Sequence, residues 1–295
     1  MPVSYIIKSL LKGIFKMTAF DRRRFLLGSV AAAAAGSLKG QHDPHADSAP
    51  IRLSVATYSF RKFPRDKTIE MLKQLGVKYV DIKEFHLPYK DSPAQLAEGR
   101  KELDAAGLTV IGGGNISLQK DDEADLRRYF DYAKACGFPM MIIAPTHETL
   151  PKIEKLVKEY NIKVAIHNHG PEDKHFPTPQ SVLAAIKNMD RRVGLCCDLG
   201  HTARAGKDPV ESLAEAGTRL FEIHIKDLKT FEPHAIQVNV GQGIMPVAAI
   251  FRQLVKMKYP GVVSLEYEIN ADNPLPGMTE SFAYMRGVIA GMTKA

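Results

Sequence analysis

Short apolar runs alternate with stretches of helical periodicity from residue 51 to the end of the chain. This alternation is typical of repeated β-α units that build a parallel sheet. The runs predict strands at residues 51–58, 78–84, 108–113, 140–144, 163–168, 193–199, 220–227 and 262–268. Helices are predicted near residues 66–75, 92–106, 121–136, 147–159, 178–188, 208–216, 245–257 and 276–292. Eight consecutive units over residues 51–295 favour an α/β fold closed into a single-domain (β/α)8 TIM barrel.

The junctions between these elements agree with the predicted boundaries. Glycine stands where three helices should stop before the next strand, at Gly76, Gly107 and Gly137, as expected of a residue that ends a helix in the left-handed conformation. Ser92-Pro93 and Asp208-Pro209 are typical of a helix N-cap followed by a proline in the first turn.

Glycine-rich turns that bind dinucleotides or phosphates would indicate a different fold. No dinucleotide turn follows the first predicted strand, which removes the main reason to prefer an open, doubly wound sheet. The run Gly112-Gly113-Gly114 lacks the Lys-Ser/Thr ending and the helix start of a phosphate loop. We interpret it as a turn that lets the backbone approach substrate.

The first 40 residues have the character of an export signal. Residues 21–27, Asp-Arg-Arg-Arg-Phe-Leu-Leu, resemble the twin-arginine signal. The apolar stretch 26–35 is too short to span a bilayer, which takes roughly 20 apolar residues. We expect a twin-arginine signal region at 1–40, a polar linker at 41–50, and a periplasmic or exported protein with no membrane anchor after cleavage. The alternative is a basic amphipathic N-terminus that stays attached.

Composition and charge narrow the choice of partners. Hydrophobic residues make up 45% of the chain and charged residues 25%, which is typical of a soluble globule with a large core. The formal net charge is +7, but residues 1–50 alone hold seven basic and three acidic side chains. The remaining 33 basic and 30 acidic residues argue against a nucleic-acid partner. Cys136, Cys196 and Cys197 are expected to be buried thiols, the adjacent pair facing opposite sides of a strand.

Polar side chains gather at the ends of four successive predicted strands, where the active site of such a barrel lies. Residues two apart share a face of a strand, so one side chain from each end can converge on the barrel axis. The four residues expected to converge are His167, Asp198, His224 and Glu266. The residues expected to share their faces further along are His169, Lys226 and Glu268.

The converging set combines two imidazoles with two carboxylates. Mixed nitrogen and oxygen donors suit one divalent ion of Mn²⁺, Co²⁺, Fe²⁺ or Zn²⁺, with positions left for substrate oxygens. Mg²⁺ fits less well because its sites are usually all oxygen. We therefore predict a single metal centre, with His167, Asp198, His224 and Glu266 as its ligands.

These strand ends resemble the xylose-isomerase-like superfamily of sugar isomerases and epimerases, which includes inosose dehydratase and the ketose 3-epimerases. The resemblance covers residues 51–290 and implies one metal held by strands five to eight. The positions that match the family pattern are Asp198 and His201 of an Asp-x-x-His motif, His224 and Glu266. His167 departs from it, because the epimerases carry a glutamate there, and it is more similar to dehydratase-like members.

The resemblance implies an enzyme that enolises a sugar or keto-sugar through a metal-bound enediolate. The base expected to remove the proton is Glu266, His169 or Glu268, while Lys226 and His201 hold substrate oxygens and supply protons. The other expected substrate contacts are Lys83, His86 and Asp227.

Several outcomes of this chemistry stay open. The same intermediate allows isomerisation, epimerisation, or β-elimination by a 3-keto-glycoside lyase or dehydratase, and His167 favours the last. Export favours an unphosphorylated sugar. A metal-dependent endonuclease would need about three zinc ions and a basic face for DNA. A non-catalytic sugar-binding barrel would keep the pocket and lose the base or the metal. Apolar strips on the barrel helices leave room for a homo-oligomer.

Overall fold

The computed structural model describes residues 49–292. The predicted twin-arginine region and nearly all of the predicted linker lie outside the described residues. Within the described part of the chain, no helix is both long and apolar enough to cross a membrane.

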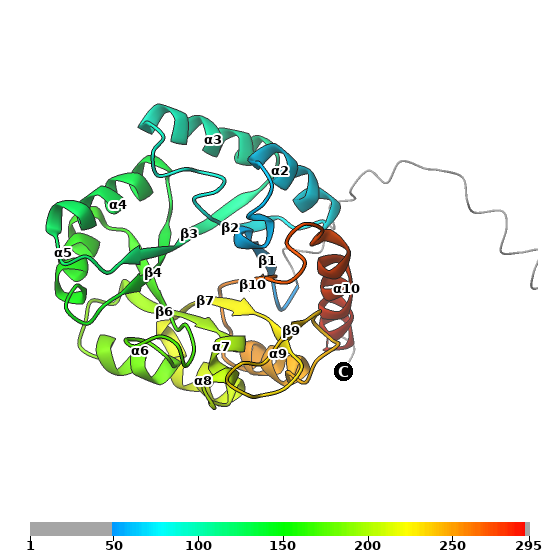
Figure 1. Cartoon of the computed structure of the whole chain (residues 1–295). Coiled ribbons are helices and arrows are strands. Elements are labelled where there is room, and N and C mark those ends of the chain that lie inside the picture. Colours follow the sequence, from blue (N-terminus) through cyan, green and yellow to red (C-terminus); the bar gives the residue numbers. More distant parts are fainter. Residues whose placement is uncertain (1–48, 293–295) are drawn as a thin grey trace, which may run out of the picture. The chain divides into compact units, whose positions relative to one another are not determined.

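Eight parallel strands close into a barrel, with neighbours in the order β1, β10, β7, β6, β5, β4, β3, β2 (Figure 1). The strands are β1 Leu53–Ala56, β2 Tyr79–Ile82, β3 Thr109–Leu118, β4 Met140–Pro145, β5 Lys163–His167, β6 Val193–Asp198, β7 Leu220–Ile225 and β10 Val263–Leu265. The predicted (β/α)8 TIM barrel is therefore confirmed.

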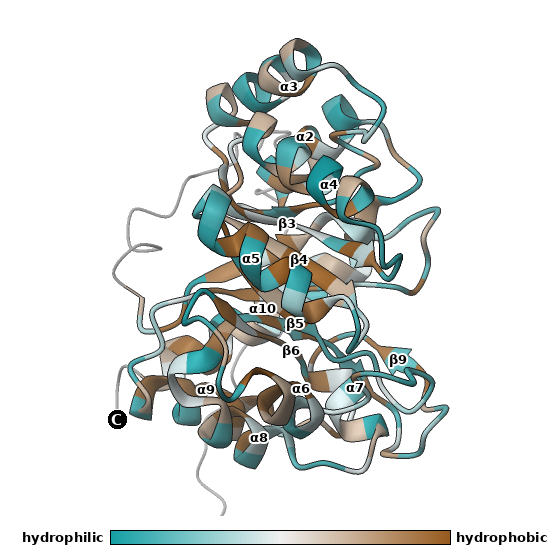
Figure 2. Ribbon diagram, turned by 90° about the vertical axis from the view of Figure 1, so that its left-hand side faces the viewer, coloured by the Kyte–Doolittle hydropathy of each residue, from teal (hydrophilic) through white to brown (hydrophobic). Residues whose placement is uncertain are grey.

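Helices surround the barrel, each lying between two successive strands or after the last (Figure 1). They are α2 Arg65–Gln74, α3 Pro93–Ala105, α4 Glu123–Ala135, α5 Leu150–Tyr160, α6 Pro179–Ile186, α8 Pro209–Ala216, α9 Val247–Lys256 and α10 Leu275–Met292. The strands are mostly hydrophobic, whereas the helices alternate between hydrophobic and hydrophilic residues (Figure 2). This pattern buries one face of each helix against the sheet and leaves the other in water.

The predicted helix boundaries have the expected local geometry. Gly76, Gly107 and Gly137 adopt φ angles of 62°, 78° and 63°, the left-handed conformation that ends a helix at little cost for glycine. Ser92 forms a capping box with Gln95 at the start of α3.

The glycine run 112–114 corrects one expectation, because it lies inside β3 rather than in a turn toward substrate. A Cβ on Gly114 would collide with the carbonyl of Ile142 on β4, and one on Gly113 with the ring of Phe138. Glycine is therefore needed for the close approach of β3 to its neighbours, which lets the strand continue to Leu118.

The core has two parts that meet at β6. Cys197 belongs to the large apolar cluster that includes residues from both the strands and the surrounding helices. Cys196 packs instead with Met140, Ile142 and Ala165 in a small separate cluster. The adjacent thiols thus face opposite sides of the strand as predicted, and all three cysteines are free.

Short elements that the hydrophobic pattern did not predict lie next to several strand ends. A 3-10 turn, η2 Thr57–Phe60, follows β1, and the short helix α7 Leu199–Arg204 follows β6. After β7 the chain forms an antiparallel pair, β8 Asp227–Leu228 with β9 Gln237–Val238. Another turn, η3 Gly217–Arg219, leads into β7. The elements after β1, β6 and β7 extend the C-terminal end of the barrel.

Candidate metal centre

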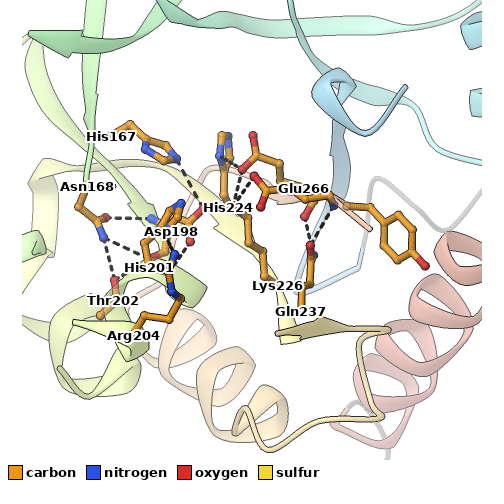
Figure 3. A network of polar contacts seen from close by, with 12 residues as sticks. His167, Asn168, Asp198, His201, Thr202, Arg204, His224, Lys226, Gln237 and Glu266 are labelled. Atoms are coloured by element: carbon orange, nitrogen blue, oxygen red, sulfur yellow. Dashed lines mark hydrogen bonds and ion pairs between the residues drawn. The ribbon is translucent and has the colours of Figure 1, made fainter. Parts of the chain in front are cut away.

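Four side chains from adjacent strand ends converge at the C-terminal end of the barrel (Figure 3). His167 ends β5, Asp198 ends β6, His224 lies in β7, and Glu266 directly follows β10. One potential ligand atom from each lies within 4.8 Å of those of the other three, and all four residues are buried. The alternation of side chains along each strand therefore places the predicted ligand set together.

The ligand atoms fit a metal because several of them make no hydrogen bond. Among the described residues, neither nitrogen of His224 makes a hydrogen bond, nor do His167 Nδ1 and Asp198 Oδ2. Asp198 Oδ2 lies 3.5 Å from His167 Nε2, and Glu266 Oε2 lies 3.4 Å from His224 Nδ1. Buried polar atoms without hydrogen bonds are costly unless an ion or water satisfies them, so this donor set fits one divalent cation.

Burial and neighbouring charges set protonation states that favour coordination at three of the four ligands. His224 is the exception, because Cys196 and the nearby carboxylates outweigh burial and hold its pKa well above the usual value. Burial lowers the pKa of His167 to about 4, which keeps its imidazole neutral near pH 7. Burial favours the neutral forms of Asp198 and Glu266, but Lys226 and nearby histidines outweigh it and hold both pKa values well below the usual range. Neutral imidazole and ionised carboxylate are the forms that bind metals.

Lys226 places a positive charge beside the two acidic ligands. Its Nζ lies 3.0 Å from Asp198 Oδ2, 2.8 Å from Glu266 Oε2 and 3.1 Å from Glu268 Oε1. The carboxylates outweigh the effect of burial and raise the pKa of Lys226 well above its ordinary value, so the ammonium stays charged. The residues predicted to share faces with His224 and Glu266 thus meet at the edge of the cluster.

Backbone and side-chain hydrogen bonds hold Asp198 in place. Its N–H donates to Asn168 Oδ1 over 2.9 Å, and its carbonyl accepts from the hydroxyl of Thr202 over 2.6 Å. Its Oδ1 caps α7 by accepting from the N–H of His201 over 2.8 Å. Oδ1 is therefore engaged in the cap, and Oδ2 is left for the centre of the cluster.

Gln237 on β9 fixes the end of β10. Its side-chain amide donates to the carbonyl of Glu266 over 2.8 Å and accepts from the N–H of Glu268 over 2.9 Å (Figure 3). These two hydrogen bonds satisfy backbone groups that a neighbouring strand would otherwise bind. They position Glu266 and Glu268 beyond Leu265, where the regular strand ends.

Asp81 on β2 is a buried carboxylate of the site that we did not predict. Its Oδ2 lies 3.6 Å from Nε2 of His224, and its Oδ1 has no hydrogen-bond partner among the described residues. Burial raises its pKa against the opposing effects of His224 and Lys83. Since we expected Lys83 to face the site, the alternation along β2 could have identified Asp81 as well.

Two predicted substrate contacts are structural instead. The imidazole of His86 is 1% exposed, with Nδ1 3.1 Å from Thr57 Oγ1 and Nε2 3.0 Å from Thr68 Oγ1. It joins η2 to α2, so both ring nitrogens already have partners within the protein. The carboxylate of Asp227 accepts four backbone N–H groups within 3.1 Å, from Leu228, Gly241, Gly243 and Met245. It closes the loop after β7.

Lys83 and His169 lie at the edges of the site. The Nζ of Lys83 donates to the carbonyl of Asn115 over 2.7 Å and lies 3.6 Å from Glu84 Oε2. The ring of His169 lies 5.4 Å from that of His167 and 4.6 Å from that of His201. Their contact with substrate stays a prediction.

A small cavity of about 200 Å³ adjoins the cluster. Its lining residues are Gly200, His201, Arg204, Lys226, Leu228, Ala235, Gln237, Glu268 and Ile269. Burial lowers the pKa of His201 to about 2, assisted by Lys226 and two neighbouring histidines, so His201 is neutral. The cavity therefore offers an ammonium, a carboxylate and a neutral imidazole within a volume that suits a small polar molecule.

The sequence matches one protein family over most of the barrel. The model of the family described as xylose isomerase-like TIM barrel matches residues 69–288. The chain belongs to this family. The xylose isomerase-like match spans every strand except β1, and it includes all four residues of the candidate metal centre.

Individual curated proteins match a smaller part of the chain. An inosose dehydratase of Mesomycoplasma hyopneumoniae is 27% identical over 160 residues, which are 48% of this chain and 53% of that protein. The chain thus spans about half the length of the curated relatives it matches.

Two solved structures share the fold of the described barrel. The IolI protein with a bound zinc atom has a TM-score of 0.67 and 18% identity, over 81% of this chain and 98% of that one. The 3-keto-D-glucoside 4-epimerase of E. coli has a TM-score of 0.67 and 17% identity, over 80% of this chain and 99% of that one. At this identity the likeness supports the fold alone.

Proposed function

We propose that the protein is a metal-dependent enzyme of the sugar isomerase and epimerase type, which enolises a sugar or keto-sugar. The observation that carries the proposal is the convergence of two imidazoles and two carboxylates, several of their atoms without hydrogen bonds, beside a cavity of about 200 Å³. The IolI protein, which shares the fold, binds a zinc atom, and this supports a divalent metal here. The ion is Mn²⁺, Co²⁺, Fe²⁺ or Zn²⁺ by the donor set.

The ion would be held by His167, Asp198, His224 and Glu266. A bound divalent ion acts as a Lewis acid that polarises a carbonyl and makes the neighbouring C–H more acidic. Glu268 is the base that we favour, because its carboxylate lines the cavity and is partly exposed. The proton moves from the sugar carbon to Glu268 Oε, and the charge that develops on the sugar oxygen lies near the Lys226 ammonium.

A second candidate, β-elimination by a 3-keto-glycoside lyase or dehydratase, has its own support. His167 occupies the strand-five position, so that position has no second carboxylate for proton transfer. Loss of a leaving group after enolisation requires one base and one proton donor. The Lys226 ammonium can be the proton donor. The match to an inosose dehydratase agrees with this outcome.

We further propose that the protein is exported through the twin-arginine pathway and acts on an unphosphorylated substrate. Arg22-Arg23-Arg24-Phe25-Leu26 supports this. Fractionation of cells that express the full chain tests it. Loss of the periplasmic protein when Arg22 and Arg23 are replaced by lysine is the expected result. Cytoplasmic protein both before and after the replacement contradicts the proposal.

Metal analysis and isotope exchange test the enzyme proposal together. The purified protein should carry about one divalent ion per chain and exchange deuterium from solvent into glucose, ketoses or 3-keto-glucosides. His224→Ala should lose the metal and the exchange, and Glu266→Gln should lose the exchange. His234→Ala is the matched control, because this side chain is 90% exposed and is not one of the four ligands.

The product identifies the reaction class. An epimer or isomer of the substrate supports the first candidate, and release of water or a glycosidic alcohol supports the second. Protein with no bound metal and no exchange into any of these sugars contradicts both, and it moves a sugar-binding barrel to first place.

A further inference from the structure

Arg204, at the end of α7, reaches back over the cavity and contacts His201. Its Nη1 lies 3.1 Å from Nδ1 of the imidazole (Figure 3). A guanidinium has only N–H donors and stays charged at any pH a protein tolerates. Nδ1 of His201 must therefore be the acceptor in this hydrogen bond, which places the single proton of the neutral ring on Nε2.

The position of the guanidinium is fixed by two further contacts. Its Nε donates to the carbonyl of Pro233 in the loop between β8 and β9, and its Nη2 pairs with Glu172 in the loop after β5. All three nitrogens are thus engaged with separate partners, each from a different part of the chain. Rotation of the guanidinium away from His201 would break these contacts as well.

Gly170 leaves the space that the imidazole needs. A Cβ on this residue would lie 2.9 Å from His201 Nδ1 and 3.2 Å from Glu172 Oε2. The absence of a side chain at the end of the His-x-His-Gly sequence after β5 therefore allows the His201 to Arg204 contact to form.

Nε2 of His201 is left for a ligand. It makes no hydrogen bond to any residue between 49 and 292, and His201 lines the 200 Å³ cavity together with Lys226 and Glu268. We propose that Arg204 is a positioning residue that fixes His201 in its Nε2–H tautomer, so that the imidazole donates a hydrogen bond to a sugar oxygen in the cavity.

This assignment deepens the proposed function and rests on it for the identity of the ligand. With His201 and Lys226 the cavity presents two donors, and with Glu268 one acceptor. Such a set recognises a carbonyl or hydroxyl oxygen next to a C–H or O–H that the carboxylate faces. His201 then acts as a neutral donor and is excluded as the base, because its lone pair is on Nδ1 and is engaged by Arg204.

Nitrogen NMR on the protein labelled with ¹⁵N-histidine tests the tautomer directly, in the presence of a chelator. The signals of His201 are assigned by their loss in His201→Gln. In the wild type, Nε2 should carry the proton and Nδ1 should not. Arg204→Met should give a mixture of the two tautomers, and Arg204→Lys should restore Nε2–H, because an ammonium that reaches Nδ1 can also only donate.

Arg100→Met is the matched control. Arg100 also binds one carboxylate, that of Asp104, and the backbone carbonyls of Cys136 and Gly137, but it lies on α3, away from the cavity. Its loss should leave the tautomer of His201 unchanged even if stability falls.

Kinetics of the same variants test whether His201 contacts the sugar. Arg204→Met should lower kcat/KM for deuterium exchange about fivefold, the factor that corresponds to one hydrogen bond, while Arg100→Met should not. A wild-type His201 protonated on Nδ1, or a tautomer unchanged in Arg204→Met, overturns the assignment. Exchange that is absent in the wild type, with the expected tautomers, refutes the proposed function and leaves the tautomer assignment intact.

Discussion

The four hydrogen bonds to Asp227 make Asp227→Asn a sharp test of how the loop after β7 is held. Oδ1 accepts the N–H groups of Leu228 and Met245, at 2.9 and 3.0 Å, and Oδ2 accepts those of Gly241 and Gly243, at 2.8 and 3.1 Å. The residue is 1% exposed. Water is therefore not available to replace a lost partner.

Asparagine keeps one oxygen and replaces the other with an NH₂ group. Two backbone N–H groups then face a donor, and two hydrogen bonds are lost. Each hydrogen bond to a charged group contributes roughly 1.5–3 kcal/mol. We therefore expect Asp227→Asn to lower the free energy of unfolding by roughly 3–6 kcal/mol, or to open the loop locally at a similar cost.

Urea denaturation and amide hydrogen exchange distinguish these two outcomes. Global destabilisation lowers the urea midpoint, whereas local opening speeds exchange of the Gly241, Gly243 and Met245 amides with little change in the midpoint. Asp272→Asn is the control. This carboxylate is 82% exposed and pairs with Lys62 over 2.7 Å, so its loss should cost less than about 1 kcal/mol. A variant at Asp227 that matches the control in both measurements refutes the reasoning.

Three further predictions concern pH, packing and metal. Burial lowers the pKa of His86 to about 4, so the neutral ring stabilises the fold fully above pH 6.5, and this stabilisation is lost as the pH falls toward 4. In thermal melts His86→Gln should lose less stability over this pH range than the wild type, and melting temperatures that fall in parallel contradict the prediction. Gly114→Ala should destabilise by about 1–3 kcal/mol in urea because its Cβ meets Ile142, whereas Gly287→Ala, with open space, should not. Zinc at 100 times its Kd should raise the free energy of unfolding by about 2.7 kcal/mol in calorimetry, and His224→Ala should abolish this stabilisation. Equal stabilisation of the variant by zinc would mean that the metal binds elsewhere.

The fold was predictable because its signal repeats. Eight apolar runs separated by helical stretches define a closed parallel barrel even where single boundaries are wrong. The eighth run, for example, predicted a strand to Glu268, but the regular strand ends at Leu265 and the side chain of Gln237 bonds the next residues. Nothing in the local sequence of either segment indicates that they meet. The extension of β3 to Leu118 likewise depends on contacts with β4.

The candidate site also contains residues that the sequence pattern could predict and residues that it could not. His167, Asp198, His224 and Glu266 followed from strand position and side-chain alternation, which are local properties. His86 and Asp227 were assigned incorrectly because a polar residue near a strand end can face a helix or a loop as easily as a cavity. Arg204 and His201 are three residues apart on α7, a helix that the hydrophobic pattern did not predict. The contacts that fix Arg204 come from two distant loops, so they could not be predicted either.

Because Asp227 holds the two ends of the segment after β7, changes within that segment need not disturb β7. The Asp227 carboxylate binds backbone N–H groups both at the start of the chain segment after β7 and at the end of that segment. Apart from Pro233, which binds Arg204, the residues between β8 and β9 are therefore not needed for this anchor. Phe231 and Ile236 in that segment are 49% and 66% exposed. Insertions or substitutions there can reshape the entrance of the barrel while β7 keeps His224 in place. New substrate preferences could therefore arise on this scaffold through a tolerant loop, without a compensating change among the metal ligands.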